Sequence, residues 1–295
     1  MRRSVKKGTT ANHEEGCGRR RSTMDKVNVV FCFAQMLENI RKEIQPPEYP
    51  QTIAIVSSAL DEGPDTGTVF DVAYAIHMAD MDKPMPECVK SFLMTVYQIG
   101  IDEGMVLCMN NMGSLYYTDR AGMKDYKRAR AYYEMAADKG YSVAATNVGY
   151  IYYYGFDTDI DYEKAYRYFS MAAAMGEIEA IYKTGDMYRY GYYVKKNDMA
   201  AMSMYDRALN LYSNCEECKC GGNIMKHMGD VFYEGIGTLK NNYTALVFYQ
   251  RAESLYYEQI KNGDPFAGAD LDYVLKTLAK IRKQIAKDLP TLIWQ

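Results

Sequence analysis

Apolar residues recur along this chain at the spacing of amphipathic helices, not at the strict alternation of half-buried strands. Over residues 27–45 the side chains of Phe31, Ala34, Leu37 and Ile40 fall near one helical face, and Pro46 follows directly. A face of that period predicts a helix, and proline cannot continue it. Helical patterns also cover residues 69–81, 88–100, 106–117, 126–139, 143–154, 162–175, 178–190, 198–212, 224–233, 243–259 and 271–286. We therefore expect an all-α protein.

Four segments repeat one arrangement of small and aromatic residues. A glycine is followed by an aromatic residue at +3, an alanine at +16, an aromatic at +20 and an alanine at +23. The copies start at Gly113, Gly149, Gly185 and Gly229, a period of 36 residues that becomes 44 after an insertion. Small residues allow two antiparallel helices to approach closely, and the ring between the alanines fills the remaining space. Units of this kind bury their apolar faces against one another, which predicts an α-solenoid of stacked helix pairs.

Helix-capping residues recur at the same register as the alanines. Asp125, Asp161, Asn197 and Asn241 each stand four residues before the first alanine of a pair. A short side-chain oxygen at that place can accept from a free N–H of the first helical turn. The recurrence supports the predicted start of each second helix independently of the hydrophobic pattern.

The same patterns divide the chain into parts. We expect a basic, disordered tail over 1–23, with Met24 as an alternative start of translation, and an N-terminal helix and linker over 24–66. A degenerate repeat follows over 67–104, in which His77 takes the place of the glycine and Tyr97 that of the ring. Four clear repeats cover 105–263 (105–140, 141–176, 177–219 and 220–263), and a capping helix lies within 264–295. Within the linker, one short helix over 51–60 is possible.

The spacing resembles a known family. A second glycine stands six residues after the first at Gly155, Gly191 and Gly235, although Asp119 departs from this rule. With the Gly, aromatic and Ala positions above, residues 105–260 resemble Sel1-like repeats, which are related to tetratricopeptide repeats. The resemblance implies a right-handed α-solenoid that serves as a non-catalytic scaffold or adaptor for a protein or peptide. In that family the first helices line a concave groove.

By this resemblance, positions −3, +1 and +4 around each first glycine would face a partner. Tyrosine and arginine among them are typical of binding hot spots, and their mixed charges favour a peptide of mixed character. The alternative is that several of the rings pack between neighbouring repeats. The predicted partner-binding residues are Asn110, Ser114, Tyr117, Thr146, Tyr150, Tyr153, Tyr182, Asp186, Arg189, Lys226, Asp230 and Tyr233.

Charge and hydropathy exclude some functions. The formal charge of the chain is −3, but residues 1–23 carry +5, which leaves −8 for the remainder. An acidic body argues against nucleic acid as a partner. The longest apolar run, over 29–37, is too short to span a membrane and shows no signal-peptide cleavage site. We expect a cytoplasmic protein, with a signal-less secreted effector acting on host proteins as an alternative.

Candidate chemistry is confined to one cysteine-containing insertion. Cys215, Cys218 and Cys220, with His227 after them, could supply ligands to zinc, although the third cysteine is crowded. An exposed, redox-sensitive loop is the simpler interpretation. With three histidines in the chain, no nucleophile–base set or phosphate-binding loop emerges. We therefore expect no catalytic residue and no cofactor, and keep a small zinc-dependent or redox-dependent function of this loop as an alternative.

Overall fold

The computed structural model describes residues 26–63, 65, 67–215, 218–264 and 267–292, and its regular elements in these ranges are all α-helices. The tail predicted over 1–23 lies outside the described residues. The helices are α1 (Lys26–Glu43), α2 (Pro50–Glu62), α3 (Thr68–Met78), α4 (Glu87–Asp102), α5 (Val106–Tyr117), α6 (Tyr126–Ala137), α7 (Ser142–Tyr154), α8 (Tyr162–Ala174), α9 (Ile178–Tyr190), α10 (Asp198–Tyr212), α11 (Gly221–Glu234), α12 (Asn242–Lys261) and α13 (Ala267–Leu292).

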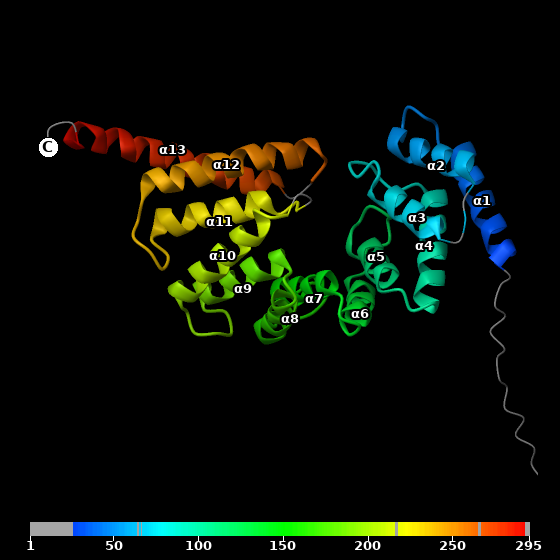
Figure 1. The fold of residues 1–295 in the computed structure, drawn as a ribbon, viewed down its shortest axis with the longest axis horizontal. Coiled ribbons are helices and arrows are strands. Elements are labelled where there is room, and N and C mark those ends of the chain that lie inside the picture. The colour runs from blue at the N-terminus through cyan, green and yellow to red at the C-terminus, as the bar shows by residue number, and fades with distance from the viewer. Residues whose placement is uncertain (1–25, 64, 66, 216–217, 265–266, 293–295) are drawn as a thin grey trace, which may run out of the picture.

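The helices stack as successive pairs along an arch (Figure 1). Helices α5 and α6, α7 and α8, α9 and α10, and α11 and α12 pack within pairs, and each second helix also packs on the next first helix. Helix α13 covers α12 at one end, and α1 to α4 form the other end. This arrangement confirms the predicted α-solenoid, in which each unit contacts mainly its neighbours.

The repeated glycines are contact points between the two helices of each pair. A Cβ atom added at Gly113 or Gly185 would lie 2.7 Å from the ring of Tyr133 or Tyr205, respectively. At Gly149 the same atom would lie 2.6 Å from two ring carbons of Phe169. Carbon atoms pack favourably at about 3.5–4.0 Å, so no side chain fits there without movement. The rings touch the first helix because these positions are glycine.

The predicted caps are present in all four second helices. The side chains of Asp125, Asp161 and Asn197 accept from the backbone N–H three residues later, and Asn241 accepts from two first-turn N–H groups. The second glycines are also explained: Gly155, for example, ends α7 in the left-handed conformation at φ +70°. In the first clear repeat, which lacks this glycine, α5 ends at Tyr117 and the next residue, Thr118, has an extended backbone.

The segment expected to be mainly a linker is part of the folded body. Helix α2 begins with Pro50 at its first position, and its neighbour Tyr49 provides no side-chain cap. Asp80 caps it instead, because its carboxylate accepts from the backbone N–H of Thr52 at 2.9 Å and from its hydroxyl at 2.8 Å. Because Asp80 lies far from α2 in the sequence, the residues of α2 itself carry no signal of this cap.

The degenerate repeat over residues 67–104 keeps the geometry of the repeat without its glycine. His77 is buried on α3, and its Nδ1 lies 3.0 Å from the hydroxyl of Tyr97 on α4. Burial lowers the pKa of His77 to about 4, so the imidazole is neutral at physiological pH. A polar contact therefore replaces the close glycine–ring packing of the later units.

The two ends of the arch approach each other. A Cβ atom placed on Gly263, in the turn between α12 and α13, would lie 4.0 Å from the Cβ of Met81 after α3. A cavity of about 650 Å³ lies at this junction, lined by Met78 from one end and by Tyr212 and Leu255 from the other. The superhelix thus brings residues far apart in sequence to one place (Figure 1).

Candidate functional site

The residues predicted to face a partner lie on the first helices α5, α7, α9 and α11, but the structure exposes them unequally. Six of the predicted side chains are only partly accessible: Ser114, Tyr117, Tyr150, Tyr153, Lys226 and Tyr233. The others are buried: Asn110, Thr146, Tyr182, Asp186, Arg189 and Asp230. The expectation that the whole set faces a partner therefore needs correction, because half of these side chains are buried.

Asp186 connects the two helices of the third pair. Its carboxylate accepts from the hydroxyl of Tyr205 at 2.7 Å and lies 3.2 Å from the ammonium of Lys183. The Nδ1 atom of His227, from the next pair, lies 3.5 Å away. Burial by itself would raise the pKa of Asp186, but its interactions with His227, with Lys183 and with the tyrosine hydroxyl outweigh burial and lower it. Asp186 is therefore an ionised structural group.

Asp230 has the same role one pair further on. It accepts from Tyr249 at 2.5 Å and from Tyr273 of α13 at 2.9 Å, and pairs with Arg189 of α9 at 2.8 Å. The same guanidinium reaches Glu234 at 2.8 Å. Burial would lower the pKa of Arg189, but the negative charge of Asp230 outweighs it and raises the pKa. Charged hydrogen bonds thus connect α9, α11, α12 and α13.

The sequence carries a signal for these contacts. In the third and fourth repeats the residue after the repeat glycine is Asp and the ring on the second helix is tyrosine, as in Asp186 with Tyr205, whereas the first repeat has Ser114 with Tyr133. Where that ring is Phe169, which has no hydroxyl, the residue is Tyr150 instead, and the two rings meet edge to face at 5.4 Å. The two positions lie 19 residues apart in both units. Their matching chemistry predicts the contact.

A second network of hydroxyls and amides crosses the first helices α7, α9 and α11 and reaches α12. Tyr150 and Tyr182 donate to the carboxylate of Glu179 at 2.8 and 2.9 Å. Asn223 accepts from Tyr256 at 2.8 Å, and its amide nitrogen lies 3.5 Å from the hydroxyl of Tyr182. Helices α7, α9, α11 and α12 are therefore linked by polar contacts, and such a network fixes the spacing of their faces.

The accessible part of this face consists of side chains that the repeat pattern did not single out. Tyr154 and Tyr190, at the ends of α7 and α9, are 49% and 50% exposed, and Tyr273 of α13 is 40% exposed. The carboxylates of Glu234 and Asp270 are 44% and 37% exposed. We call these five residues the rim. Several of them contact the buried network, because Tyr273 donates a hydrogen bond to Asp230 and Glu234 pairs with Arg189.

Aromatic side chains continue from the rim along the edge of the first helices. Neighbouring ring centroids lie 4.9–5.9 Å apart in this row, within the range of favourable aromatic pairs. The row is Tyr117, Phe156, Tyr154, Tyr153, Tyr192 and Tyr190. It provides a semi-rigid apolar surface that crosses three repeats.

The candidate zinc ligands do not form a site. Cys215 and Cys218 form a disulfide, and burial raises the pKa of Cys220 to about 12. The imidazole of His227 is stacked on Tyr205, with ring centroids 4.8 Å apart, and burial lowers its pKa to about 4. Among the described residues, no three His, Cys, Asp or Glu side chains are arranged to hold a metal ion. Packing between neighbouring repeats, not metal binding, explains His227.

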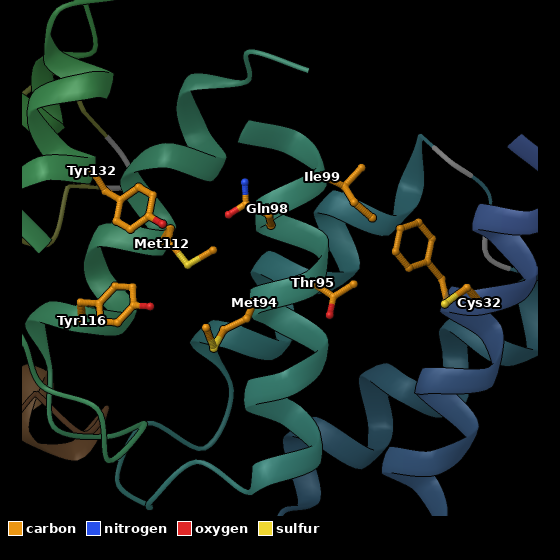
Figure 2. Close-up of a pocket in the computed structure, with 9 residues that line it drawn as sticks. Cys32, Met94, Thr95, Gln98, Ile99, Met112, Tyr116 and Tyr132 are labelled. Carbon is orange, nitrogen blue, oxygen red and sulfur yellow. The ribbon is translucent and has the colours of Figure 1, made fainter. Parts of the chain in front are cut away.

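An apolar cavity lies on another part of the molecule. It has a volume of about 540 Å³ and lies among α1, α4, α5 and α6. In Figure 2, Cys32 lies on one side and Tyr132 on the other, with Thr95 and Ile99 of α4 between them. Its lining contains no histidine, carboxylate or lysine. No described helix has the length and apolar character of a membrane span.

Comparisons with known proteins agree with this geometry. The Sel1 repeat family matches residues 106–141, 142–177, 178–213 and 225–257. No curated protein sequence matches the chain. A solved structure of a protective antigen with an SLR fold from uropathogenic Escherichia coli is 19% identical, with a TM-score of 0.55 over 88% of this chain and 51% of the other. This chain thus spans about half the length of that protein.

Two further solved structures are more distant. A Sel1 repeat protein from Oxalobacter formigenes is 16% identical, with a TM-score of 0.48 over 86% of this chain and 97% of that protein. An immunity protein from Pseudomonas aeruginosa is 18% identical, with a TM-score of 0.40 over 83% and 86% of the two chains. The repeat spacing, the glycine–ring packing and the matches to each helix pair lead to one conclusion: the chain carries four Sel1 repeats stacked as an α-solenoid and is a Sel1-repeat protein.

Proposed function

We propose that this protein is a non-catalytic scaffold that binds a protein or peptide along its first helices. The observation that carries the proposal is the contrast between the rim and the layer beneath it. Tyr154 and Tyr190 are half exposed, whereas Asp186, Arg189 and Asp230 below them are buried and internally paired. Exposed aromatic side chains on a rigid support are typical of binding surfaces.

The buried network supports binding by holding the rim in place. The ion pair of Arg189 with Asp230 joins α9 to α11, and the bond from Tyr273 joins α13 to them. A partner that binds across several repeats therefore meets side chains whose spacing is already set. Such preorganisation lowers the entropic cost of association.

The experiment must alter the rim and leave this support intact. Charge reversal at Asp186 or Arg189 is unsuitable, because it would place a like charge in a buried ion pair and unfold the repeat. We instead combine Tyr154→Ala with Tyr190→Ala. Tyr257 on α12 is 53% exposed and has no place in the rim, so Tyr257→Ala is the matched control.

Affinity capture followed by mass spectrometry compares the two variants with the wild-type chain. We expect at least one partner to be lost with the rim variant and retained with Tyr257→Ala. A photo-crosslinking residue at Tyr190 should label the same partner. If every captured protein is retained by the folded rim variant and none is crosslinked from position 190, the inner face is not the binding surface.

A further inference from the structure

The most exposed charged side chains of the network on the first helices are carboxylates, whereas its cations are largely buried. The cations Lys183, Arg189 and Lys226 are 14%, 8% and 16% exposed. Each is held by a carboxylate, as in the 2.6 Å contact between Lys226 and Asp270. The carboxylates of Glu234 and Asp270 are exposed to 44% and 37%. A partner approaching the rim therefore meets negative charge, although both signs are present in the sequence.

The aromatic rings of this face already hold cations within the protein. The guanidinium of Arg189 lies 5.0 Å from the ring centroid of Tyr190. The ammonium of Lys183 lies 5.5 Å from the ring centroids of Tyr150 and Tyr182. Electron-rich ring faces attract cations at such distances. Rings of the same kind at the rim can receive a cation from outside.

The exposed carboxylates and the exposed rings lie close to each other. Tyr190 follows Arg189 directly, and Arg189 pairs with Glu234, so a half-exposed ring and a half-exposed carboxylate flank one guanidinium. Tyr273 reaches the same cluster through its bond to Asp230. A lysine or arginine of a partner can thus contact a ring face and a carboxylate at once. An acidic side chain would instead meet like charge, which disfavours its approach.

We propose that the partner of this face is a peptide segment rich in lysine and arginine, held by the carboxylates of Glu234 and Asp270 and by the rings of Tyr190 and Tyr273. The proposal rests on the proposed binding function and specifies its chemistry. It replaces the mixed-charge peptide that the sequence suggests, because the cations of these ion pairs are largely buried whereas the carboxylates of Glu234 and Asp270 remain partly exposed.

The test measures binding of fluorescein-labelled synthetic peptides to the full chain by fluorescence anisotropy. One peptide repeats glycine, arginine and lysine, and a second of equal length repeats glycine, glutamate and aspartate. We expect the basic peptide to bind and the acidic peptide to bind at least about tenfold more weakly, with an affinity that falls as salt is added.

Isosteric variants assign the effect to the rim. The double variant Glu234→Gln, Asp270→Asn should weaken binding of the basic peptide by about tenfold, roughly threefold for each carboxylate. Glu163→Gln on α8 is the matched control, because Glu163 is 49% exposed and pairs with Arg167 at 3.2 Å in the same way. The Glu163→Gln variant should bind the basic peptide with the affinity of the wild-type chain. Circular dichroism verifies that all variants are folded.

The outcomes separate this inference from the proposed function. Equal binding of both peptides, or unchanged binding by the folded double variant, overturns the basic-segment proposal. A cellular partner that crosslinks at Tyr190 through an acidic or uncharged segment also overturns it, while the scaffold function stands. If no protein crosslinks there and the rim variant Tyr154→Ala, Tyr190→Ala retains every partner, the proposed function itself fails.

Discussion

Replacing Gly149 by alanine tests the packing on which the whole stack depends. The new Cβ would lie 2.6 Å from two ring carbons of Phe169, whereas ordinary carbon contacts are about 3.5–4.0 Å. Helices α7 and α8 must therefore move apart by roughly 1 Å or the ring must leave its place. Overpacking costs about 1–3 kcal/mol, and removing a glycine from a helix gains about 1 kcal/mol. We expect a net loss of up to about 2 kcal/mol in the free energy of unfolding.

A glycine with free space around it serves as the control. A Cβ added at Gly268, near the start of α13, meets no atom within 4 Å. Gly268→Ala should therefore be neutral or stabilise the protein by up to about 1 kcal/mol. In a third variant, Gly149→Ala is combined with Phe169→Leu, which removes the obstructing ring. The alanine should then cost less than in the wild-type background, and the difference measures the coupling of the two positions.

Urea denaturation followed by far-UV circular dichroism provides the measurement. Neighbouring repeats unfold cooperatively only when their interfaces are strong, so the slope of the transition is compared along with its midpoint. If Gly149→Ala is as stable as Gly268→Ala, the close approach of helix and ring is not what holds the pairs together. Equal effects of the alanine with and without the ring would refute the reasoning as well.

Three further predictions concern the buried charges and the caps. Arg189→Met leaves Asp230 buried without its cation and should cost about 3–5 kcal/mol in urea denaturation, whereas Arg41→Ala at an ion pair on the surface should cost no more than about 1 kcal/mol. The pKa of His227 is lowered by burial from 6.5 to about 4, so the unfolded chain takes up this proton first. Stability is thus full above pH 6.5 and falls by up to roughly 3 kcal/mol as the pH approaches 4, and His227→Gln should remove that part of the pH dependence. Asn197→Ala removes a cap that accepts at 3.0 Å and should lower the thermal stability by about 1 kcal/mol; no change would mean that water replaces the cap.

Local patterns predicted the helix pairs closely. Helices α5, α9 and α10 begin and end at the predicted residues. The caps at Asp125 and Asn197 were also correct. These features depend on residues within a few positions of each other, and one helical turn decides whether such an interaction can form. The repeat multiplied each local signal, which made the pattern clear.

Interactions between distant segments were harder to read. Helix α2 was expected mainly as a linker because its cap is Asp80, which reaches Thr52 only in the folded chain. Asp186 and Arg189 were expected to face a partner, yet the next pair covers them. The helical period indicates on which side of a helix a residue lies. It does not indicate how far the neighbouring helix overlaps that side.

The spacing of glycine, alanine and aromatic residues by itself determined the unit of this protein, because close helix packing needs small residues opposite a ring at fixed positions. Tertiary structure alone decided which side chains of the inner face remain accessible. Arg189 and Asp230 lie in different repeats, and their contact buries one cation while Glu234 beside it stays exposed. The sign of the charge offered to a partner results from that contact between repeats, and a linear sequence shows the charges without showing which of them neutralise each other.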